Sequence, residues 1–264
     1  MATESIAGNW ALVTGASSGF GVEFATLLAG QRANLVLVAR SGDRLQQFAD
    51  DLSARYKTRT AIEAMDLSVM GAGASLKRRL DARGIDVDIL VCNAGYGLYG
   101  GLIEQPLERT LNMLQLNIVT LTELTQLFAT DMVRRRSGHI LLVASLLGFQ
   151  PVPGYAAYAA SKAYVLHFGE ALFEELKPHG VTVTVLSPGA TATGFADVAS
   201  QRDTGMLRLL MMQPRPVAQL GIAALLGRRS SVTAGVWNNV IAFSNRFTPR
   251  RVQRLIMQRV FAGR

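Results

Sequence analysis

Residues 10–21 read Trp10-Ala11-Leu12-Val13-Thr14-Gly15-Ala16-Ser17-Ser18-Gly19-Phe20-Gly21, and this stretch decides the fold. Its apolar first half predicts a buried strand, and the glycines that follow have the spacing TGxxxGxG. Gly15 permits a tight turn, Gly19 lets the backbone approach a pyrophosphate, and Gly21 lets the next helix pack closely on the strand. Because the N–H groups that begin this helix face the turn, the stretch predicts a phosphate-binding loop that includes Ser17, Ser18 and Phe20.

The chain up to Pro188 repeats the alternation of a short apolar run and a longer amphipathic segment. We predict strands at 10–14, 34–39, 60–65, 89–92, 139–144 and 181–186, and helices at 21–31, 43–56, 69–83, 106–135 and 156–177. Helical connections of this length require parallel strand pairing and right-handed crossovers. The predicted fold is therefore α/β: a Rossmann-type doubly wound parallel sheet with helices on both faces and a ligand site beyond the carboxyl ends of the strands.

The composition fits a single domain over residues 1–264, because 49% of the chain is apolar and no linker or repeat divides it. Cys92 is the only cysteine and lies in an apolar run, so a disulfide framework is excluded and a reducing, cytoplasmic compartment is expected. The sequence has neither a basic leader nor an apolar stretch long enough to cross a bilayer. We therefore predict neither secretion nor membrane spanning.

The net charge of +8 is distributed unevenly. No carboxylate follows Asp203, and the charged residues beyond it are Arg208, Arg215, Arg228, Arg229, Arg246, Arg250, Arg251, Arg254, Arg259 and Arg264. Such asymmetry fits an acidic partner, a membrane surface or nucleic acid, although a solvated or subunit-facing surface is the interpretation that we favour. Aromatic and basic residues do not interleave as in nucleic-acid platforms, so we expect no nucleic-acid partner.

The second predicted strand ends at Arg40, about 20 residues beyond the glycines, where an NAD-binding protein usually has Asp or Glu. A carboxylate there would repel a 2′-phosphate, whereas a guanidinium pairs with it. We therefore predict that the chain binds NADP(H) in preference to NAD(H), through Arg40 assisted by Arg44. The alternative is a solvent-facing arginine at the end of the strand.

Two further strand ends carry candidate cofactor contacts. Asp66 and Leu67 follow the third strand, where Asp66 could accept from the adenine amino group or cap the helix expected from Val69. Asn93, Ala94 and Gly95 follow the fourth strand. The small residues let the backbone run close to a cofactor, and Asn93 can brace the neighbouring strands.

The candidate catalytic residues are Ser145, Tyr158 and Lys162. Ser145 ends the fifth strand, and the i, i+4 spacing of Tyr158 and Lys162 puts both on one helix face. A free tyrosine has a pKa of about 10, and we expect the nearby ammonium to lower the pKa of Tyr158 so that its phenol exchanges a proton with substrate. Ser145 would donate a hydrogen bond to the substrate oxygen. No GxSxG elbow surrounds it, which counts against a hydrolase.

These motifs, in this order, resemble the short-chain dehydrogenase/reductase family over about residues 8 to 195. The resemblance implies that Lys162 also holds the nicotinamide ribose, that Asn117 is a fourth catalytic residue retaining a water in a proton relay, and that Pro188, Gly189 and Thr191 or Thr193 touch the nicotinamide. It also implies a substrate lid at 190–213, a bulky hydrophobic carbonyl or alcohol as the small-molecule substrate, and a homo-oligomer, dimer or tetramer, assembled through the helices at 106–135 and 156–177.

Residues 247–264 predict a basic amphipathic helix. Val252, Leu255, Ile256 and Val260 share one face, and Arg250, Arg251, Arg254 and Gln258 lie away from it. The helix could rest on an anionic membrane, attract a phosphorylated acyl carrier, or bury its apolar stripe against the domain or another subunit. We favour packing or assembly over peripheral membrane contact.

Two other functions compete with a carbonyl reductase. A nucleotide-sugar epimerase or dehydratase also uses Tyr-xxx-Lys, but usually has TGxxGxxG spacing and a substantial carboxyl-terminal substrate domain. A non-enzymatic NADP(H)-binding redox sensor or scaffold would need only the cofactor site. The intact set of Ser145, Tyr158 and Lys162 argues against it.

Overall fold

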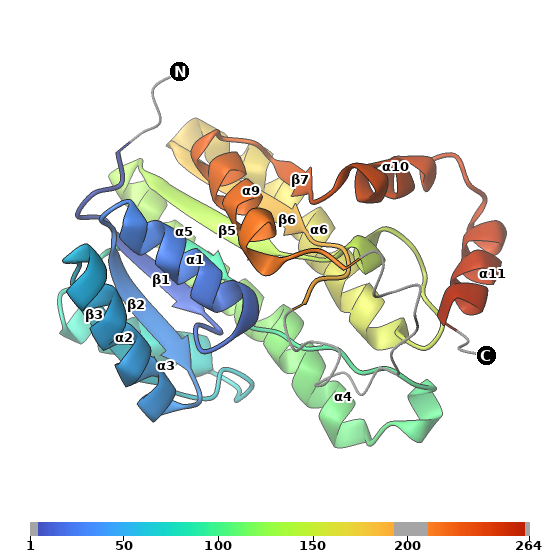
Figure 1. The fold of residues 1–264 in the computed structure, drawn as a ribbon, viewed down its shortest axis with the longest axis horizontal. Coiled ribbons are helices and arrows are strands. Elements are labelled where there is room, and N and C mark those ends of the chain that lie inside the picture. The colour runs from blue at the N-terminus through green and yellow to red at the C-terminus, as the bar shows by residue number, and fades with distance from the viewer. Residues whose placement is uncertain (1–4, 193–210, 262–264) are drawn as a thin grey trace.

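The computed structural model describes residues 5–192 and 211–261. A parallel sheet of seven strands in the order β3-β2-β1-β4-β5-β6-β7 runs through the molecule (Figure 1). The strands are β1 (Trp10–Thr14), β2 (Asn34–Ala39), β3 (Thr60–Ala64), β4 (Val87–Cys92), β5 (Gly138–Val143), β6 (Val181–Ser187) and β7 (Ser231–Thr233). This confirms the predicted doubly wound sheet, with the order reversing between β1 and β4.

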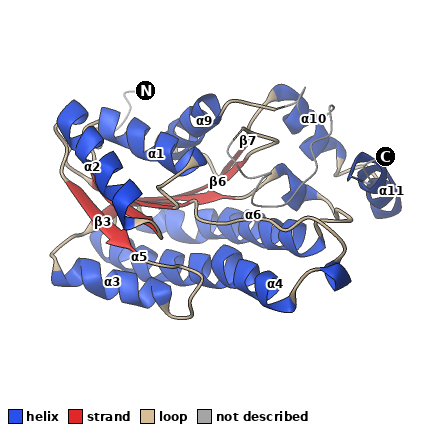
Figure 2. Cartoon of the chain, turned by 60° about the horizontal axis from the view of Figure 1, so that its bottom comes forward, coloured by secondary structure: helices blue, strands red, loops and turns tan. Residues whose placement is uncertain are grey.

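Helices cover both faces of the sheet (Figures 1 and 2). They are α1 (Gly19–Gly30), α2 (Gly42–Tyr56), α3 (Ala72–Ala82), α4 (Leu107–Leu114), α5 (Leu121–Arg135), α6 (Ala156–Leu176), α9 (Pro214–Leu226), α10 (Val236–Ser244) and α11 (Arg250–Phe261). Neighbouring residues of β2 point to opposite faces, so Leu35 packs with α1, α2 and α9 while Val36 packs with α3, α5 and α6. Both layers are buried, as a parallel sheet requires.

Some element boundaries differ from the predicted ones. The helix expected from Val69 begins at Ala72, because Gly71 before it adopts a left-handed conformation with φ +75°. The expected continuous helix at 106–135 is interrupted by a π-helical turn, Gln115–Thr120, between α4 and α5. Asp66 therefore does not cap α3: its carboxylate accepts hydrogen bonds from the Ser68 amide (2.9 Å) and hydroxyl (2.7 Å).

The basic helix expected at 247–264 forms as α11, and its apolar stripe does not pack on the domain, one of the two placements that we favoured; contact with another subunit stays a prediction. The stripe is exposed, with Leu255 and Ile256 each 49% accessible. The inward face instead holds buried Gln253, with Met257 and Phe261 packed on a cluster that includes Tyr155 and Tyr158. Gln253 takes the buried position because its amide donates to the carbonyls of Asn245 and Thr248, each at 2.8 Å.

Candidate active site

The turn between β1 and α1 has a shape that requires glycine. Gly15 and Gly19 have φ of +69° and +51°, in the left-handed region. A Cβ at Gly15 would lie 2.9 Å from the Asn93 amide nitrogen, and one at Gly21 would lie 2.0 Å from the Gly15 carbonyl oxygen. The glycines thus leave a backbone cradle that any side chain at these positions would fill.

The start of α1 presents free N–H groups to this cradle. Ser18 is the N-cap residue in extended conformation, and its side chain makes no capping hydrogen bond. A helix N-terminus with uncapped amides and a positive dipole end attracts anions. The cradle therefore fits the diphosphate of a nicotinamide dinucleotide; Ser17, Ser18 and Phe20 belong to this turn and the start of α1, and their contact with a cofactor stays a prediction.

Asn93 and Ala94 fix the β4 end to the β1 end. The Thr14 hydroxyl accepts from the backbone amides of Asn93 and Ala94, both at 2.9 Å. It donates in turn to the Val91 carbonyl at 3.2 Å. The Asn93 side-chain amide donates to the Thr14 carbonyl at 2.9 Å, which is the bracing role expected of it.

Arg40 follows β2 and is exposed, beside Asp66 at the end of β3. Hydrogen bonds from Ser68 lower the pKa of Asp66 against a smaller opposing effect of burial, and the nearby charge of Arg40 lowers it further. Leu67 is buried, and its carbonyl accepts from the Thr120 hydroxyl at 2.8 Å. Arg40 and Asp66 thus lie at the sheet edge where the adenosine end of a dinucleotide would reach.

Ser145, Tyr158 and Lys162 are brought together at the carboxyl end of β5. Ser145 directly precedes a short helical turn, and its side chain accepts from the Leu147 amide at 3.2 Å. Its hydroxyl is hydrogen-bonded to the phenol of Tyr158, which is only 6% exposed. Lys162 lies one turn along α6, with its nitrogen 5.9 Å from the centre of the Tyr158 ring. The predicted geometry of these side chains is present.

The electrostatics of this group differ from the prediction. Burial raises the pKa of Tyr158 to about 12, although the hydrogen bond with Ser145 opposes the rise. Burial also lowers the pKa of Lys162 to about 8. The Lys162 ammonium donates to the Val143 carbonyl at 2.8 Å instead of to the phenol. In this structure desolvation of the Tyr158 phenol therefore outweighs the expected lowering by Lys162.

Asn117 is fully buried within the π-helical turn between α4 and α5. Its side-chain oxygen accepts from the Tyr96 amide (3.2 Å), and its amide group donates to the Tyr96 carbonyl (3.0 Å) and to the Ser161 hydroxyl (3.2 Å). π-Helical turns in α-helices occur often at functional sites. Neither Tyr96 nor Ser161 could be found from motif spacing.

Gly95 lies between Asn117 and Lys162. A Cβ on Gly95 would stand 2.8 Å from the Asn117 side-chain oxygen and 3.5 Å from the Lys162 nitrogen. We predicted a small residue here because the backbone would run close to a cofactor. The structure adds a second reason, because two side chains of the site also lie close to Gly95.

The segment after β6 supplies the remaining predicted contacts. The Pro188 carbonyl accepts from the Leu146 amide at 2.8 Å, and the Thr191 hydroxyl donates to the Gly189 carbonyl at 3.0 Å. A Cβ at Gly189 would lie 2.2 Å from the Asn238 amide nitrogen, a neighbour that the sequence did not indicate. Thr193 and most of the predicted lid, residues 193–210, lie outside the described residues.

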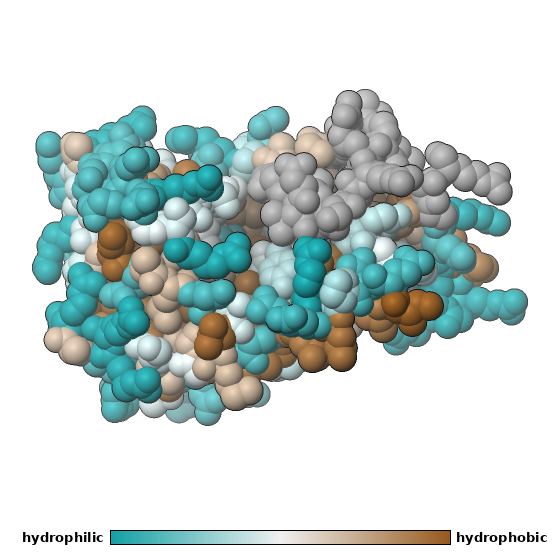
Figure 3. All heavy atoms as spheres, turned by 90° about the horizontal axis from the view of Figure 1, so that it is seen from below, coloured by the Kyte–Doolittle hydropathy of each residue, from teal (hydrophilic) through white to brown (hydrophobic). Residues whose placement is uncertain are grey.

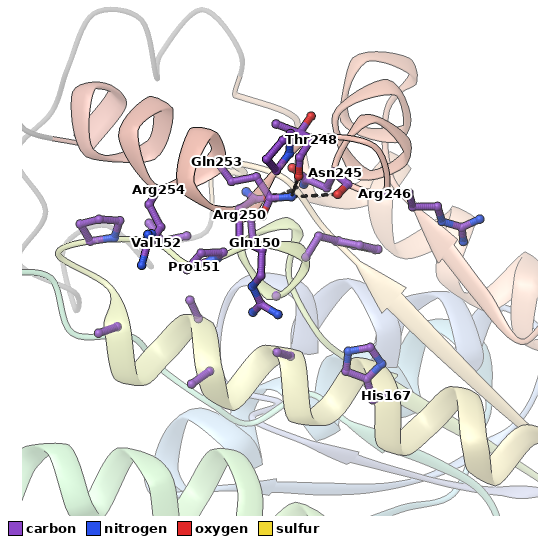
Figure 4. Close-up of a pocket in the computed structure, with 18 of the residues that line it drawn as sticks. Gln150, Pro151, Val152, His167, Asn245, Arg246, Thr248, Arg250, Gln253 and Arg254 are labelled. Atoms are coloured by element: carbon purple, nitrogen blue, oxygen red, sulfur yellow. Dashed lines mark hydrogen bonds between the residues drawn. The ribbon is translucent and has the colours of Figure 1, made fainter.

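A cavity of about 910 Å³ lies on the other side of α6 (Figure 4). It is lined by Ala156, Ala160, Ala163 and His167 on α6 and by residues at the start of α11, including Arg250 and Arg254. Helical spacing puts these α6 residues opposite Tyr158 and Lys162. Ser145, Tyr158 and Lys162 do not line this cavity, although Ala159, next to Tyr158, does.

The comparison with known families agrees with this geometry. The sequence model described as short chain dehydrogenase matches residues 9–204, which is most of the chain. The chain belongs to the short-chain dehydrogenase family. This is a family of oxidoreductases, and every motif position that led to the sequence resemblance lies within the matched residues. Family membership thus rests on a match over residues 9–204 as well as on the order of the motifs.

Similar proteins of this family include a very-long-chain 3-oxoacyl-CoA reductase of Phaeosphaeria nodorum, 36% identical over 197 residues. That match covers 72% of this chain and 57% of the relative, so the chain spans little more than half of that protein's length. A solved short-chain dehydrogenase from Sphingobium yanoikuyae in complex with NADPH is 29% identical with a TM-score of 0.80, covering 90% and 94% of the two chains. A bulky-bulky ketone specific alcohol dehydrogenase from Comamonas testosteroni is 27% identical with a TM-score of 0.76, covering 90% and 93%.

Proposed function

We propose that this short-chain dehydrogenase is an NADP(H)-dependent enzyme that interconverts a carbonyl and a secondary alcohol on a bulky hydrophobic substrate. The observation that carries the proposal is the Ser145 hydroxyl hydrogen-bonded to the buried phenol of Tyr158, with Lys162 one helical turn away. The group lies at the carboxyl ends of parallel strands, next to the glycine cradle. This is where doubly wound sheets bind their ligands.

The chemistry follows from what these side chains can donate. When bound, the nicotinamide cofactor supplies or accepts the hydride. In the reductive direction Tyr158 gives its proton to the carbonyl oxygen, while the Ser145 hydroxyl donates a hydrogen bond that stabilises the developing negative charge. The Lys162 ammonium, held by the Val143 carbonyl at 2.8 Å, stabilises the phenolate that is left. Asn117 keeps the backbone at Tyr96 in position and has the water-relay role that we predicted from the family.

The preference for NADP(H) rests on Arg40. Its exposed guanidinium after β2 can pair with a 2′-phosphate, and a similar dehydrogenase was solved in complex with NADPH. The experiment is a comparison of the Kd for NADPH and NADH in the wild type, in Arg40→Asp and in Arg55→Asp, the last removing a charge from the exposed end of α2. We expect Arg40→Asp alone to reverse the preference. Equal binding of both cofactors by the wild type would overturn this part of the proposal.

The substrate class rests on the named relatives, one acting on very-long-chain 3-oxoacyl-CoA and another specific for bulky-bulky ketones. A panel of carbonyl compounds, from small ketones to long-chain 3-oxoacyl thioesters and polycyclic ketones, should be followed by NADPH oxidation. We expect kcat/KM to rise with the apolar size of the substrate. Preference for small polar ketones would contradict the proposal.

A cytoplasmic location stays a prediction. Cys92 is buried, and burial raises the pKa of its thiol to about 12, so the residue behaves as the small hydrophobe that we expected. Fractionation of cells that express the chain would check the location, and recovery in a secreted fraction would contradict it.

A further inference from the structure

Helix α10 has a composition that is unusual for a surface helix. It reads VWNNVIAFS and contains no charged residue. Its outward face is the apolar one: Val236, Trp237 and Phe243 are 79%, 74% and 59% exposed, whereas only the small Ala242 is buried. Surface helices normally show the reverse pattern, and exposed apolar patches of this kind mark sites of interaction.

Helix α11 continues this surface with apolar side chains and arginines together. Its inward face holds Gln253, which donates to the carbonyls of Asn245 and Thr248 (Figure 4), together with Met257 and Phe261. Val252, Leu255 and Ile256 are consequently left outward. Helical spacing puts Arg259 on the same outward side and the exposed Arg251 at its border. The two helices lie together at one end of the molecule in both ribbon views (Figures 1 and 2).

The charges of this surface all have one sign. Because no carboxylate follows Asp203, α10, α11 and their connection hold only arginines as charged residues. Arg250, Arg251, Arg254 and Arg259 make no ion pair with any residue in the part of the chain that the structure describes, since the ion pairs there all lie between residues 63 and 135. No carboxylate among the described residues therefore neutralises the positive charge of these four arginines through an ion pair.

We propose that α10 and α11 form a peripheral membrane-binding surface for anionic lipid bilayers. Interfacial helices insert Trp, Phe and Leu side chains between headgroups while arginines on the same helices pair with lipid phosphates. Trp237 and Phe243 are exposed on the same helix, Phe243 packs on the exposed Phe247 and contacts Arg246, and no carboxylate lies among them, so the surface meets both requirements. The proposal concerns binding and does not depend on the proposed activity.

A second copy of the chain fits this surface less well than a bilayer does. A two-fold contact brings the same patch of both copies together, so arginines would face arginines with no carboxylate from either patch. An anionic bilayer supplies the opposite charge along with the apolar environment. Charge complementarity therefore favours an anionic bilayer over a second copy of the chain as the partner of this surface.

A second group of exposed apolar residues lies at the same end of the molecule. Leu102, Ile103, Leu107 and Leu111 are exposed on α4 and the turn before it. In Figure 3, hydrophobic side chains form patches along the lower edge of the face right of its centre, as well as on its left side. The phenol of Tyr99, just before that turn, donates to the carbonyl of Phe261 at the end of α11. Of this second group, Leu102 and Ile103, which precede α4, add apolar surface near the proposed membrane contact.

The first test is co-sedimentation of the full chain with phosphatidylcholine vesicles that contain or lack phosphatidylserine. We expect binding to the anionic vesicles that weakens with added salt. Arg251→Glu with Arg259→Glu should reduce it by at least about tenfold, and Trp237→Gln should also reduce it. The matched controls are Arg78→Glu, an exposed arginine on α3, and Met70→Gln, an apolar residue that is 85% exposed.

The second test uses the emission of Trp237, since the chain has only Trp10 besides it. In a Trp10→Phe variant, anionic vesicles should shift the emission to the blue and protect it from acrylamide. The proposal is overturned if anionic vesicles neither bind the chain nor shift this emission. It is equally overturned if the α11 charge reversal leaves binding unchanged, or if Trp237 is already shielded without lipid in a dimer.

Discussion

At Gly95, adding a single methyl group should reduce activity without preventing folding. Its Cβ would press on the Asn117 oxygen and approach the Lys162 nitrogen at 3.5 Å, although Gly95 is not in the left-handed region. We predict that Gly95→Ala folds but loses most of its turnover, measured as kcat with NADPH. Gly30→Ala is the control, because a Cβ there meets only the Tyr56 ring at 3.8 Å. Equal activity of the two variants would show that the spacing around Gly95 is unimportant.

Lys162 should make stability depend on pH in a defined direction. Its pKa falls from 10.5 in the unfolded chain to about 8 on folding, so below about pH 8 the folded state bears the full cost of a buried charge. Between about pH 8 and 10.5 the folded lysine is neutral while the unfolded chain still holds the proton. The cost therefore falls progressively as the pH rises through this range, and it is absent above it.

We therefore predict that Lys162→Met is more stable than the wild type at neutral pH. The gain should be roughly 1–3 kcal/mol, since the lost hydrogen bond to Val143 offsets part of the relieved burial. Urea unfolding of both proteins across the range from about pH 8 to 10.5 should show the difference shrinking. A pH-independent difference would mean that Lys162 is not buried as a perturbed base.

At the residue scale the sequence predicted Ser145, Tyr158 and Lys162 together, because strand ends and i, i+4 spacing are local geometry. It could not predict that Lys162 donates to Val143, since that bond depends on how deeply the side chain is buried. The contacts of Asn117 were also out of reach, because they depend on a π-helical turn that apolar periodicity does not reveal.

At the element scale the strands up to β6 were predicted to within about two residues, because buried parallel strands are apolar on both faces. The three-residue β7 lies at the sheet edge and is only half buried, so it gives no apolar run. Neither α9 nor α10 was predicted. The apolar face of α10 points outward. A helix predicted from its apolar residues would therefore have been placed with that face toward the core.

Helix α11 is connected to Tyr158 through a chain of aromatic rings. Phe261 packs edge-on against Tyr155 at 5.4 Å between ring centres, and Tyr155 lies 5.8 Å from Tyr158. We predict that Phe261→Ala lowers the free energy of unfolding by roughly 1–3 kcal/mol and reduces kcat, because the cluster loses a ring. Val260→Ala, at the exposed neighbour, should leave both unchanged. Identical behaviour of the two variants in thermal unfolding and turnover would argue against this prediction.

At the scale of the whole molecule the exposed surface of the long helices bears on assembly. Leu107 and Leu111 on α4 and Tyr164 on α6 are exposed, on helices that resemble the family's assembly surfaces. We predict a dimer or tetramer in light scattering and a smaller species for Leu111→Arg, because a two-fold contact places the new charge against its copy. Val69→Arg, outside these helices, should not change the mass. A monomeric wild type would contradict the prediction.

The arginine asymmetry seen in the sequence has a location in the molecule. The described arginines of α11 lie at the end of the molecule opposite to α2 and α3, so the uneven charge is also uneven in space (Figure 1). The sequence showed the asymmetry and the amphipathic helix and assigned its apolar stripe to packing on the domain or to assembly; the structure contradicts the first of these. Packing on the domain depends on which helix face points inward, and in α11 this is the face of the buried Gln253 instead of the apolar stripe.

The central claim is that Tyr158 delivers the proton in carbonyl reduction with NADPH. The direct measurement is turnover of the best carbonyl substrate by Tyr158→Phe, with NADPH binding checked by fluorescence titration. Tyr164→Phe is the control, because Tyr164 is an exposed tyrosine of the same helix whose hydroxyl is hydrogen-bonded to Thr122. We expect Tyr158→Phe to bind NADPH normally and to lose turnover by at least about a hundredfold, while the control keeps it. Full turnover in Tyr158→Phe would contradict the claim.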